Sequence, residues 1–541
     1  MRAPRPAIQH GLSAVFLIAL SFILFSPILS APFWAVDEWE VLQFSSVEPL
    51  HPQSGLYRPG MNSVDDYVNF VLLDSTQFGR FRPFWHANRF IQASLFGQNA
   101  VAWHTALLAM LSATSILSYA AGRAVGMGWL SATLVPLWMI VAVQANEVWW
   151  RVGPNETAGM VVLAFGVFAA VKASRKPSAN RWDVAMLVGL GLACLSKESF
   201  ALTIPAILFG RVALTVYHGP ATWRETTRRI LPILIIGLGT AAFCLTMAWL
   251  AGRRGGWGAN TVGLGVQSLL PWNWLADLRV LEPLMLFFLP AFLAFVIAPN
   301  LPNARIAGPW NLVGLAGFAL WVIPQLILYG SAVLAGRFLY PLIAGPAALN
   351  GWSIDVLVKR RLRLLAAIAL LPTVLVLGRL ALDTYNEVGR VAAQSTAFSE
   401  MLNAAAVAAG DRAILIAADP ALNPEWVCAI PPLLGSKGWS NPLYLHNVHE
   451  SGDPVAANYE SYLATCLGGE QYVDPTALGD EEVGAVILLS SEEAFNAAAP
   501  VWWDSAEWHV VEHTATFETV RLNRSAPPTT VTFRTLERLD S

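Results

Sequence analysis

Long apolar runs without charged residues divide most of the sequence into segments of similar length. The first run, "GLSAVFLIALSFILFSPILS" (11–30), has about the 20 residues that a helix needs to cross a bilayer. It ends without a clear small-residue cleavage site, so we interpret it as a retained helix rather than a signal peptide. Comparable runs predict membrane spans at 11–31, 99–120, 127–145, 157–172, 183–196, 200–217, 230–250, 281–298, 309–328, 337–357 and 364–381. The sequence therefore predicts an α-helical polytopic membrane protein with about 11 transmembrane helices. The short fifth run joins the sixth through "SKES", which leaves the count open.

Composition indicates the same class of protein. Hydrophobic residues make up 55% of the 541 residues and charged residues 13%, which is too apolar for a soluble protein of this size. The sequence contains no Walker loop, dinucleotide-binding fingerprint, HExxH motif or zinc-ligand spacing. Membrane orientation explains the basic loops between the spans, so no nucleic-acid partner is predicted.

Charge divides the chain into two parts. Residues 383–541 contain 22 acidic and 7 basic side chains, whereas residues 1–382 contain 15 acidic and 27 basic ones. Many of those basic residues lie in loops that share one side of the membrane with the N-terminus, such as "KASRKPSANR" and "KRRLR". Because cytoplasmic loops are enriched in Lys and Arg, the N-terminus is predicted to be cytoplasmic in the inner membrane. The long first loop (31–98) and the acidic tail are then extracytoplasmic.

The tail, residues 383–541, has the pattern of a small α/β domain. "RAILIAAD" and "GAVILLSS" predict buried strands, and "STAFSEMLNAAAVAAG" predicts a helix that Gly410 ends. We find no catalytic signature there and interpret the tail as an extracytoplasmic accessory domain. Cys428 and Cys466 could form a disulfide in an oxidising compartment, or could remain unpaired.

Charged residues recur at the predicted outer ends of the spans. In "APFWAVDEWEVLQF" (31–44), the adjacent carboxylates Asp37 and Glu38 stand among aromatic residues where the chain leaves the membrane. Buried charge at such positions is costly unless it is paired or lies in a solvated cavity, so the pattern suggests a polar site. Some of these charges, such as Arg89 and Glu156, are interpreted as ordinary juxtamembrane residues.

Five stretches carry this charge pattern in a fixed order, and together they resemble a known family. They are "DE" (37–38), "RFRPFWHANRFIQASLFGQNAVAWHTALLAML" (80–111), "NEVWWRVGPNETAGMVVLAFGVFAA" (146–170), "LACLSKESFALTIPAILF" (192–209) and "GRFLYPLIAGPAAL" (336–349). They resemble motifs of the GT-C superfamily of membrane glycosyltransferases, which use polyprenyl-phosphate sugars. The similarity is to bacterial members of the protein O-mannosyltransferase-like and aminoarabinose-transferase-like kind. It covers roughly residues 12–360 and leaves out the acidic tail.

The resemblance implies a GT-C-like fold and a set of catalytic roles. Asp37 matches the first acid of the family motif and is expected to be the general base, with Glu38 as an alternative base or acceptor-orienting group. The donor phosphate would be held first by Arg337, which matches a lipid-phosphate-contacting Arg of the family. The next candidates for contact with the donor phosphate are, in order, Lys197, Arg82 and Arg58. These roles suit sugar transfer, which needs a carboxylate to deprotonate the acceptor and cations to stabilise the departing phosphate.

Other residues are candidates for substrate binding, each with a structural alternative. Glu147 and Arg151 are four residues apart and could form a local ion pair instead. Glu198 could simply pair with Lys197 at the helix junction. His86 and His104 could approach donor or acceptor or have structural roles, and Tyr340 belongs to the last of the five motifs.

No obligatory metal is predicted. Asp37 with Asp65 or Asp66 could offer oxygen ligands to Mg²⁺ or Mn²⁺, but the spacing is not diagnostic and "VDDY" could cap a loop helix.

The leading hypothesis is therefore transfer of a sugar from a polyprenyl-phosphate donor in the membrane to an extracytoplasmic acceptor. The acceptor could be a protein hydroxyl, a lipid-linked glycan or an envelope polysaccharide. A transporter or flippase is the first alternative, but it predicts inverted repeats and mid-bilayer polar groups that the sequence lacks. A surface-polysaccharide polymerase or ligase is the second, and it predicts a larger late loop than 251–280. The pattern carries no signal for oligomeric state.

Overall fold

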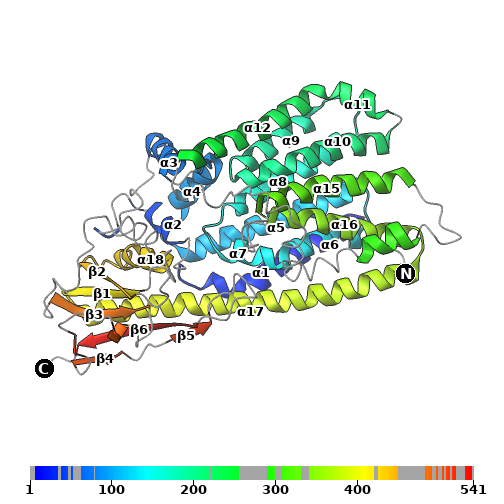
Figure 1. Ribbon diagram of the computed structural model, residues 1–541. Helices are drawn as coiled ribbons and strands as arrows, with labels where there is room; N and C mark the ends of the chain where they lie inside the picture. Colours follow the sequence, from blue (N-terminus) through cyan, green and yellow to red (C-terminus); the bar gives the residue numbers. More distant parts are fainter. Residues whose placement is uncertain are drawn as a thin grey trace.

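A computed structural model describes residues 6–33, 38–44, 46, 50–52, 63–77, 80–219, 221–254, 289–298, 308–329, 340–418, 424–448, 482–489, 495–497, 503–504, 507–511, 515–518 and 530–538. Long helices lie side by side in a bundle, with short helices and a sheet at one end (Figure 1). We call this end the sheet end and the opposite end, where the first helix begins, the N-terminal end. The bundle helices are α1 (Pro6–Leu29), α5 (Ala100–Val125), α6 (Trp129–Val141), α7 (Val143–Trp150), α8 (Glu156–Ala173), α9 (Arg181–Cys194), η1 (Glu198–Thr203), α10 (Ile204–His218), α12 (Leu231–Arg254), α15 (Gly308–Tyr329), α16 (Tyr340–Lys359) and α17 (Arg363–Ala409).

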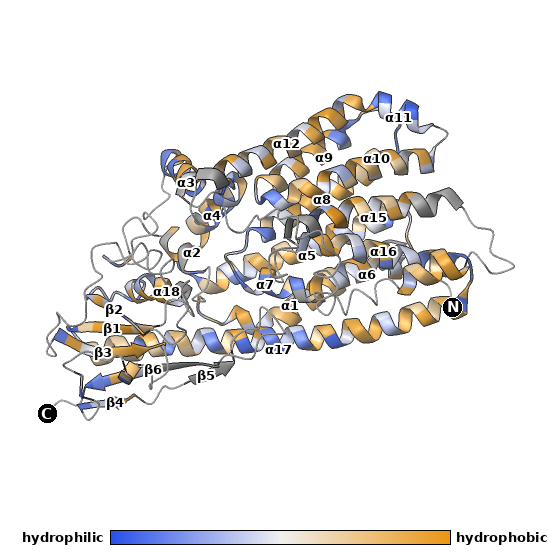
Figure 2. Ribbon diagram, in the orientation of Figure 1, coloured by the Kyte–Doolittle hydropathy of each residue, from blue (hydrophilic) through white to orange (hydrophobic). Residues whose placement is uncertain are grey.

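Apolar residues cover these helices along the length of the bundle (Figure 2). Among the described residues, six helices are long and apolar enough to cross a membrane, and α6 with α7 adds a seventh if the bent pair is one span. The chain is a multi-pass membrane protein. The predicted total of 11 spans stays a prediction, because the range 281–298 is described only from residue 289 onward.

The span predicted at 127–145 differs from the structure. The chain forms two helices, α6 and α7, which meet at Ala142 with a bend of 71°. Ala142 has an extended ψ of 141°, so the helical hydrogen-bond ladder is interrupted there. After the bend, α7 packs against α5, α6, α16 and α17. Its tryptophans Trp149 and Trp150 are fully buried there.

The last span continues far beyond its predicted end. The prediction ended it at residue 381, but α17 has 47 residues and a length of about 70 Å at 1.5 Å per residue. A bilayer core is about 30 Å thick, so one helix both crosses it and carries the sheet (Figure 1). The predicted boundary between residues 382 and 383 therefore lies inside a helix. Gly410, with φ of 56°, ends α17 as predicted.

The sheet packs on the second half of α17. Its order is β2-β1-β3-β6-β4, with β5 paired to β6, and the strands β1 and β3 are the two predicted from the sequence. Both are completely buried and run parallel to each other, as expected for continuous apolar strands. The strand bounds are β1 (Ala413–Ala418), β2 (Leu443–Asn447), β3 (Val483–Leu488), β4 (Trp508–Val510), β5 (Ala515–Glu518) and β6 (Thr530–Arg538).

The first loop and the tail share one hydrophobic core. The short helices α2 (Trp39–Phe44), α3 (Val64–Gln77) and α4 (Pro83–Phe96) meet α18 (Pro424–Gly435) of the tail in a single buried cluster. His51 Nε2 lies 3.1 Å from the Asn441 carbonyl oxygen, and its ring stacks on Trp439 at 5.8 Å. The tail is thus anchored to the loop that follows the first span. Cys428 is disulfide-bonded; Cys466, which the sequence analysis left as one possible partner, lies outside the described residues.

Candidate active site at the sheet end

Three segments that are distant in sequence meet at the sheet end of the bundle. These are the start of α4, the loop between α7 and α8, and the junction between α9 and η1. The Phe84 amide donates to the Leu195 carbonyl oxygen at 3.0 Å, and Arg89 Nη2 donates to the Pro154 carbonyl oxygen at 3.4 Å. The start of α4 is therefore fixed against both other segments.

Lys197 forms an ion pair with Glu156 in the interior of this region. The Lys197 ammonium donates to Glu156 Oε1, and the two side chains are 2% and 1% exposed. Lys197 directly precedes η1, and Glu156 is the first residue of α8, where a carboxylate also favours the positive end of the helix dipole. The interpretation of Glu156 as an ordinary juxtamembrane charge is wrong, because it is the buried counter-ion of Lys197.

Arg82 and Glu198 extend this pair into a row of alternating charges. Arg82 Nη2 lies 3.6 Å from Glu198 Oε1, in the position immediately before Pro83 opens α4. Lys197 also interacts electrostatically with both residues. Glu198 thus faces Arg82, and the direct partner of Lys197 is Glu156 rather than the neighbouring Glu198. Two of the predicted phosphate-binding cations, Lys197 and Arg82, lie together.

Glu38 joins the same region through the loop before α8. Its side chain is fully buried, and Glu38 Oε1 accepts a 2.8 Å hydrogen bond from the Val152 amide. Glu38 Oε2 lies 3.7 Å from His104 Nε2 on α5, and both side chains are fully buried. Val152 bonds Glu38, and Glu156 pairs with Lys197. The loop 152–156 therefore connects the carboxylate of Glu38 to the cation of Lys197.

We call these residues the charged site. It comprises Glu38, Arg82, His104, Glu156, Lys197 and Glu198. Chemically, it combines three carboxylates, two cations and an imidazole whose Nε2 lies 3.7 Å from one carboxylate, which is longer than a hydrogen bond. Cations of this kind can bind an anionic group, and carboxylates can bind hydroxyl groups.

Tyr340 contacts α7, the helix that leads directly into the loop before α8. Tyr340 is fully buried; its hydroxyl donates to the Met139 carbonyl oxygen at 2.9 Å and accepts from Trp149 Nε1 at 2.8 Å. These bonds tie the start of α16 to α6 and α7. The Arg151 guanidinium lies over the Trp150 ring at 4.5 Å, and Glu147 is buried one turn earlier.

His86 and Arg89 stabilise the short helices of the first loop. His86 Nε2 lies 2.9 Å from Asp74 Oδ2, which joins α4 to α3. The Arg89 guanidinium lies 5.7 Å from the ring centroids of both Trp85 and Trp103. Arg89 is 1% exposed, so its interpretation as a juxtamembrane surface charge is wrong. His86 belongs to this helix contact rather than to the charged site.

Three predicted site residues, Asp37, Arg58 and Arg337, lie outside the described residues. The described part of the chain contains no group of three or more His, Cys, Asp or Glu side chains arranged to hold a metal ion. Asp66 accepts hydrogen bonds from the amide and hydroxyl of Ser63 at the start of α3, so it caps that helix. Asp65, beside it, is exposed.

Two residues of this region were missed by the sequence analysis, Glu156 as a counter-ion and Asp74 as the partner of His86. A signal for Glu156 existed, because a lysine between two apolar runs is rarely buried without an acid beside it. No comparable signal existed for Asp74, whose partner is selected by the packing of α3 on α4.

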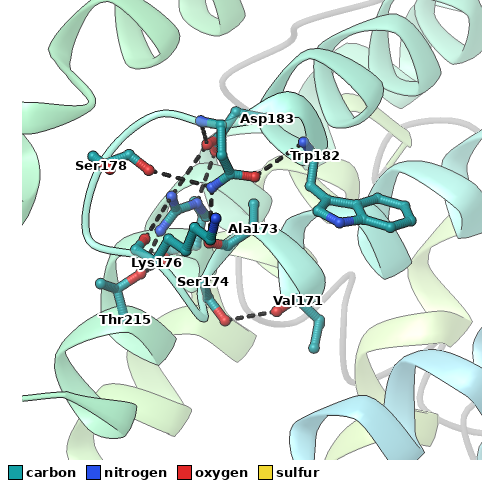
Figure 3. Close-up of polar contacts among 10 residues, drawn as sticks. Val171, Ala173, Ser174, Lys176, Ser178, Trp182, Asp183 and Thr215 are labelled. Carbon is teal, nitrogen blue, oxygen red and sulfur yellow. Dashed lines mark hydrogen bonds and ion pairs between the residues drawn. The ribbon is translucent and has the colours of Figure 1, made fainter.

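A second buried ion pair lies at the N-terminal end (Figure 3). Arg211 Nε donates to Asp183 Oδ1 at 2.8 Å, and Arg211 Nη2 donates to Asp183 Oδ2 at 3.2 Å and to the Lys176 carbonyl oxygen at 3.1 Å. Asp183 also accepts from the Asn180 amide and completes the capping box of α9. The Asp183 carboxylate and the Arg211 guanidinium are fully buried and paired with each other, so we interpret the cluster as structural.

Comparisons with known proteins give structural neighbours only. No protein-family model and no curated protein matches the sequence. The structure is similar to that of ArnT from Cupriavidus metallidurans in the apo state, with 14% identity over 96% of this chain and 97% of that chain and a TM-score of 0.45. The same protein bound to undecaprenyl phosphate aligns over the same shares of the two chains with 13% identity and a TM-score of 0.44.

A third structure, the Archaeoglobus fulgidus oligosaccharyltransferase in complex with Zn and sulfate, is 14% identical over 88% of this chain and 67% of that chain. Its TM-score is 0.41. The function proposed for this chain rests on the residues of the charged site.

Proposed function

We propose that the chain is a membrane glycosyltransferase of GT-C type that moves a sugar from a polyprenyl-phosphate donor to an extracytoplasmic acceptor. The observation that supports this function best is the charged site. Carboxylates and cations between residues 38 and 198, most of them buried, lie on either side of the loop 152–156, where the apolar helices end. A lipid-linked donor has its reactive phosphate at that depth, directly above its hydrocarbon chain.

In this proposal the first-loop acids deprotonate the acceptor. Asp37 is the first candidate for the general base, and Glu38 either replaces it or orients the acceptor. His104 Nε2, 3.7 Å from Glu38 Oε2, helps to position that carboxylate. Lys197 and Arg82, with Arg337 and Arg58, stabilise the phosphate as the bond to the sugar breaks. Electrostatic stabilisation of this kind is strongest where water is excluded.

The remaining candidates would complete the substrate pocket. Glu198 holds Arg82 at 3.6 Å and so positions a phosphate ligand. At α7, Glu147 and Arg151 could contact sugar hydroxyls, and Tyr340 holds this helix through Trp149. The reaction is proposed to need no obligatory metal, although Mg²⁺ or Mn²⁺ could assist.

The proposed orientation places the N-terminus in the cytoplasm and the sheet end outside the inner membrane. The many basic residues at the N-terminal end support it, and so does the disulfide-bonded Cys428 at the sheet end, since disulfides persist outside the cytoplasm. The acceptor would then be an extracytoplasmic protein, lipid-linked glycan or envelope polysaccharide.

The test is release of lipid phosphate by the purified full-length chain in nanodiscs supplied with defined polyprenyl-phosphate sugars. We expect turnover with at least one donor and loss of turnover in Asp37→Asn and Arg337→Ala. The matched control is Glu225→Gln, which alters an exposed pair at the opposite end of the bundle. Equal turnover in all four proteins would overturn the site. Substrate flux across vesicles without lipid-phosphate release would favour a transporter.

A further inference from the structure

An apolar cavity of about 310 Å³ lies inside the bundle, among α5, α6, α8, α10, α15 and α16. Small side chains open the space, and larger apolar side chains close it. Its walls include Ala164, Gly317, Ala344, Ala348, Trp321 and Met160. This volume falls within the roughly 300–1,000 Å³ of small-molecule binding sites. Because the lining offers almost no hydrogen-bonding groups, the cavity suits a hydrocarbon chain rather than a sugar or an ion.

The cavity ends below the charged site. The part of the cavity closest to the sheet end is lined by Met139, Met160 and Ala344. Met160 lies one helical turn after Glu156 in α8, and Ala344 lies one helical turn after Tyr340 in α16. Tyr340 is fully buried beside this part of the cavity, and its hydroxyl donates to the carbonyl oxygen of the lining residue Met139 and accepts from Trp149.

Toward the N-terminal end, the cavity continues into a second hollow of about 260 Å³. The two share six lining residues, Val125, Met127, Leu214, Gly314, Gly317 and Trp352. The second hollow reaches Tyr217 and Lys359, whose side chains are among the exposed ones. The path from the interior therefore opens where α10 and α16 end.

The opening has a basic rim. The Lys359 ammonium donates to the Gly126 carbonyl oxygen at 2.7 Å and to Asp355 Oδ2 at 2.6 Å, and it remains 57% exposed. Asp355 in turn accepts from the Gly128 amide at 2.6 Å through its other oxygen. Lys359 is thus held at the rim while its charge still faces outward. The next residues along the chain add three arginines, Arg360, Arg361 and Arg363.

We propose that this cavity binds one acyl chain of an anionic phospholipid from the leaflet at the N-terminal end, with the lipid phosphate at Lys359. The apolar interior fits the chain, and the basic rim fits the negative headgroup. The exposed opening beside Tyr217 and Lys359 favours entry from this leaflet over entry of the hydrocarbon chain of a donor at the sheet end. The site is independent of the proposed transferase reaction.

The probe is phosphatidylglycerol with a photoreactive diazirine in its acyl chain, incorporated into nanodiscs that contain the full-length protein. Cross-linked peptides are identified by mass spectrometry, and α15 and α16 are expected to be labelled. Gly317→Leu fills the cavity, and its new Cβ would meet only the Phe209 ring at an ordinary 3.6 Å. A leucine side chain takes up space that the lipid chain would otherwise fill, so labelling should fall at least about tenfold.

The matched control is Gly239→Leu on α12, where an added Cβ meets nothing within 4 Å. It should label as the wild type does. Lys359→Gln should abolish the preference for phosphatidylglycerol over a phosphatidylcholine probe of the same chain. Unchanged labelling in Gly317→Leu would overturn the proposal. So would labelling of the same peptides by a photoreactive polyprenyl phosphate together with no labelling by the phospholipid.

Discussion

At the scale of the residue, the charged site depends on which charges face each other. The sequence predicted that Lys197, Arg82 and Glu38 belong to one region. In the described residues Arg82 lies beside Glu198, Lys197 pairs with Glu156, and Glu38 lies beside His104 and bonds the Val152 amide. The sequence did not predict that Glu156 is the partner of Lys197. Apolar periodicity marks where helices end, but the partner of a terminal charge depends on how two helices that are distant in sequence are packed.

The Lys197–Glu156 pair allows stability and function to be separated. Glu156→Gln or Lys197→Met alone leaves one buried charge without its partner and should destabilise the fold by about 3–5 kcal/mol. The double variant removes both charges and should recover most of that stability. Thermal unfolding of the purified proteins measures this effect.

The double variant should nevertheless stay inactive in the lipid-phosphate release assay, because Lys197 is proposed to stabilise the departing phosphate. A stable double variant with wild-type turnover would show that the pair has only a structural role.

At the scale of the element, several boundaries differ from those predicted. The strands β1 and β3 and the end of the last helix at Gly410 were predictable, because continuous apolar runs and a helix-ending glycine are local signals. The break at Ala142 and the continuation of α17 past residue 381 were not. At the break α7 packs against other bundle helices, and beyond residue 381 α17 packs against the sheet. A sequence window does not contain information about such distant contacts.

The helix α18 packs very closely against the first loop. A Cβ added to Gly435 would lie 2.0 Å from the Leu50 carbonyl oxygen, which is part of the backbone. Gly435→Ala should therefore loosen α18 from the first loop. Hydrogen exchange of residues 424–435 should accelerate in this variant and stay unchanged in Gly389→Ala, whose added Cβ meets nothing within 4 Å. Equal protection in the two variants would argue against the close contact.

The same contact should weaken in acid through His51. Burial lowers the pKa of His51 from 6.5 to about 4. The folded state therefore excludes a proton that the unfolded chain accepts, so the contribution of His51 is complete above pH 6.5 and is lost as the pH falls toward 4. The maximum loss is about 3 kcal/mol.

Hydrogen-exchange protection factors near residues 439–441, which are corrected for the intrinsic exchange rate at each pH, measure this change at pH 7 and pH 5. His51→Gln, which cannot titrate, should remove most of the pH dependence. A pH response of the same size in that variant would assign it to another group.

At the scale of the whole molecule, paired charges lie at both ends of the helix bundle. The ion pair of Asp183 and Arg211 and the exposed pair of Glu225 and Arg229 lie at the N-terminal end, while the charged site lies at the sheet end. Helix order and the sides of the loops follow from hydropathy and Lys/Arg counts. Which loops converge on one site does not follow from them, because many helix arrangements satisfy the same topology.

The proposed orientation predicts opposite accessibility of the two ends in intact cells. Glu225→Cys on α11 (Trp223–Arg229), an exposed helix at the N-terminal end, should react with a membrane-impermeant maleimide only after the cells are opened. Val407→Cys on α17, where the native side chain is 83% exposed, should react before. The reverse pattern would invert the topology and place the charged site in the cytoplasm.

The central claim is that a carboxylate just after the first span acts together with cations near residues 82 and 197. The most direct measurement is the initial rate of lipid-phosphate release from a polyprenyl-phosphate sugar by Glu38→Gln and by the Asp37→Asn/Glu38→Gln double variant, each compared with Glu225→Gln. Loss of a general base should slow the reaction by about 10²–10⁴-fold. We expect that loss in the double variant, with Glu225→Gln at the wild-type rate. A double variant that turns over as fast as the control would contradict the account.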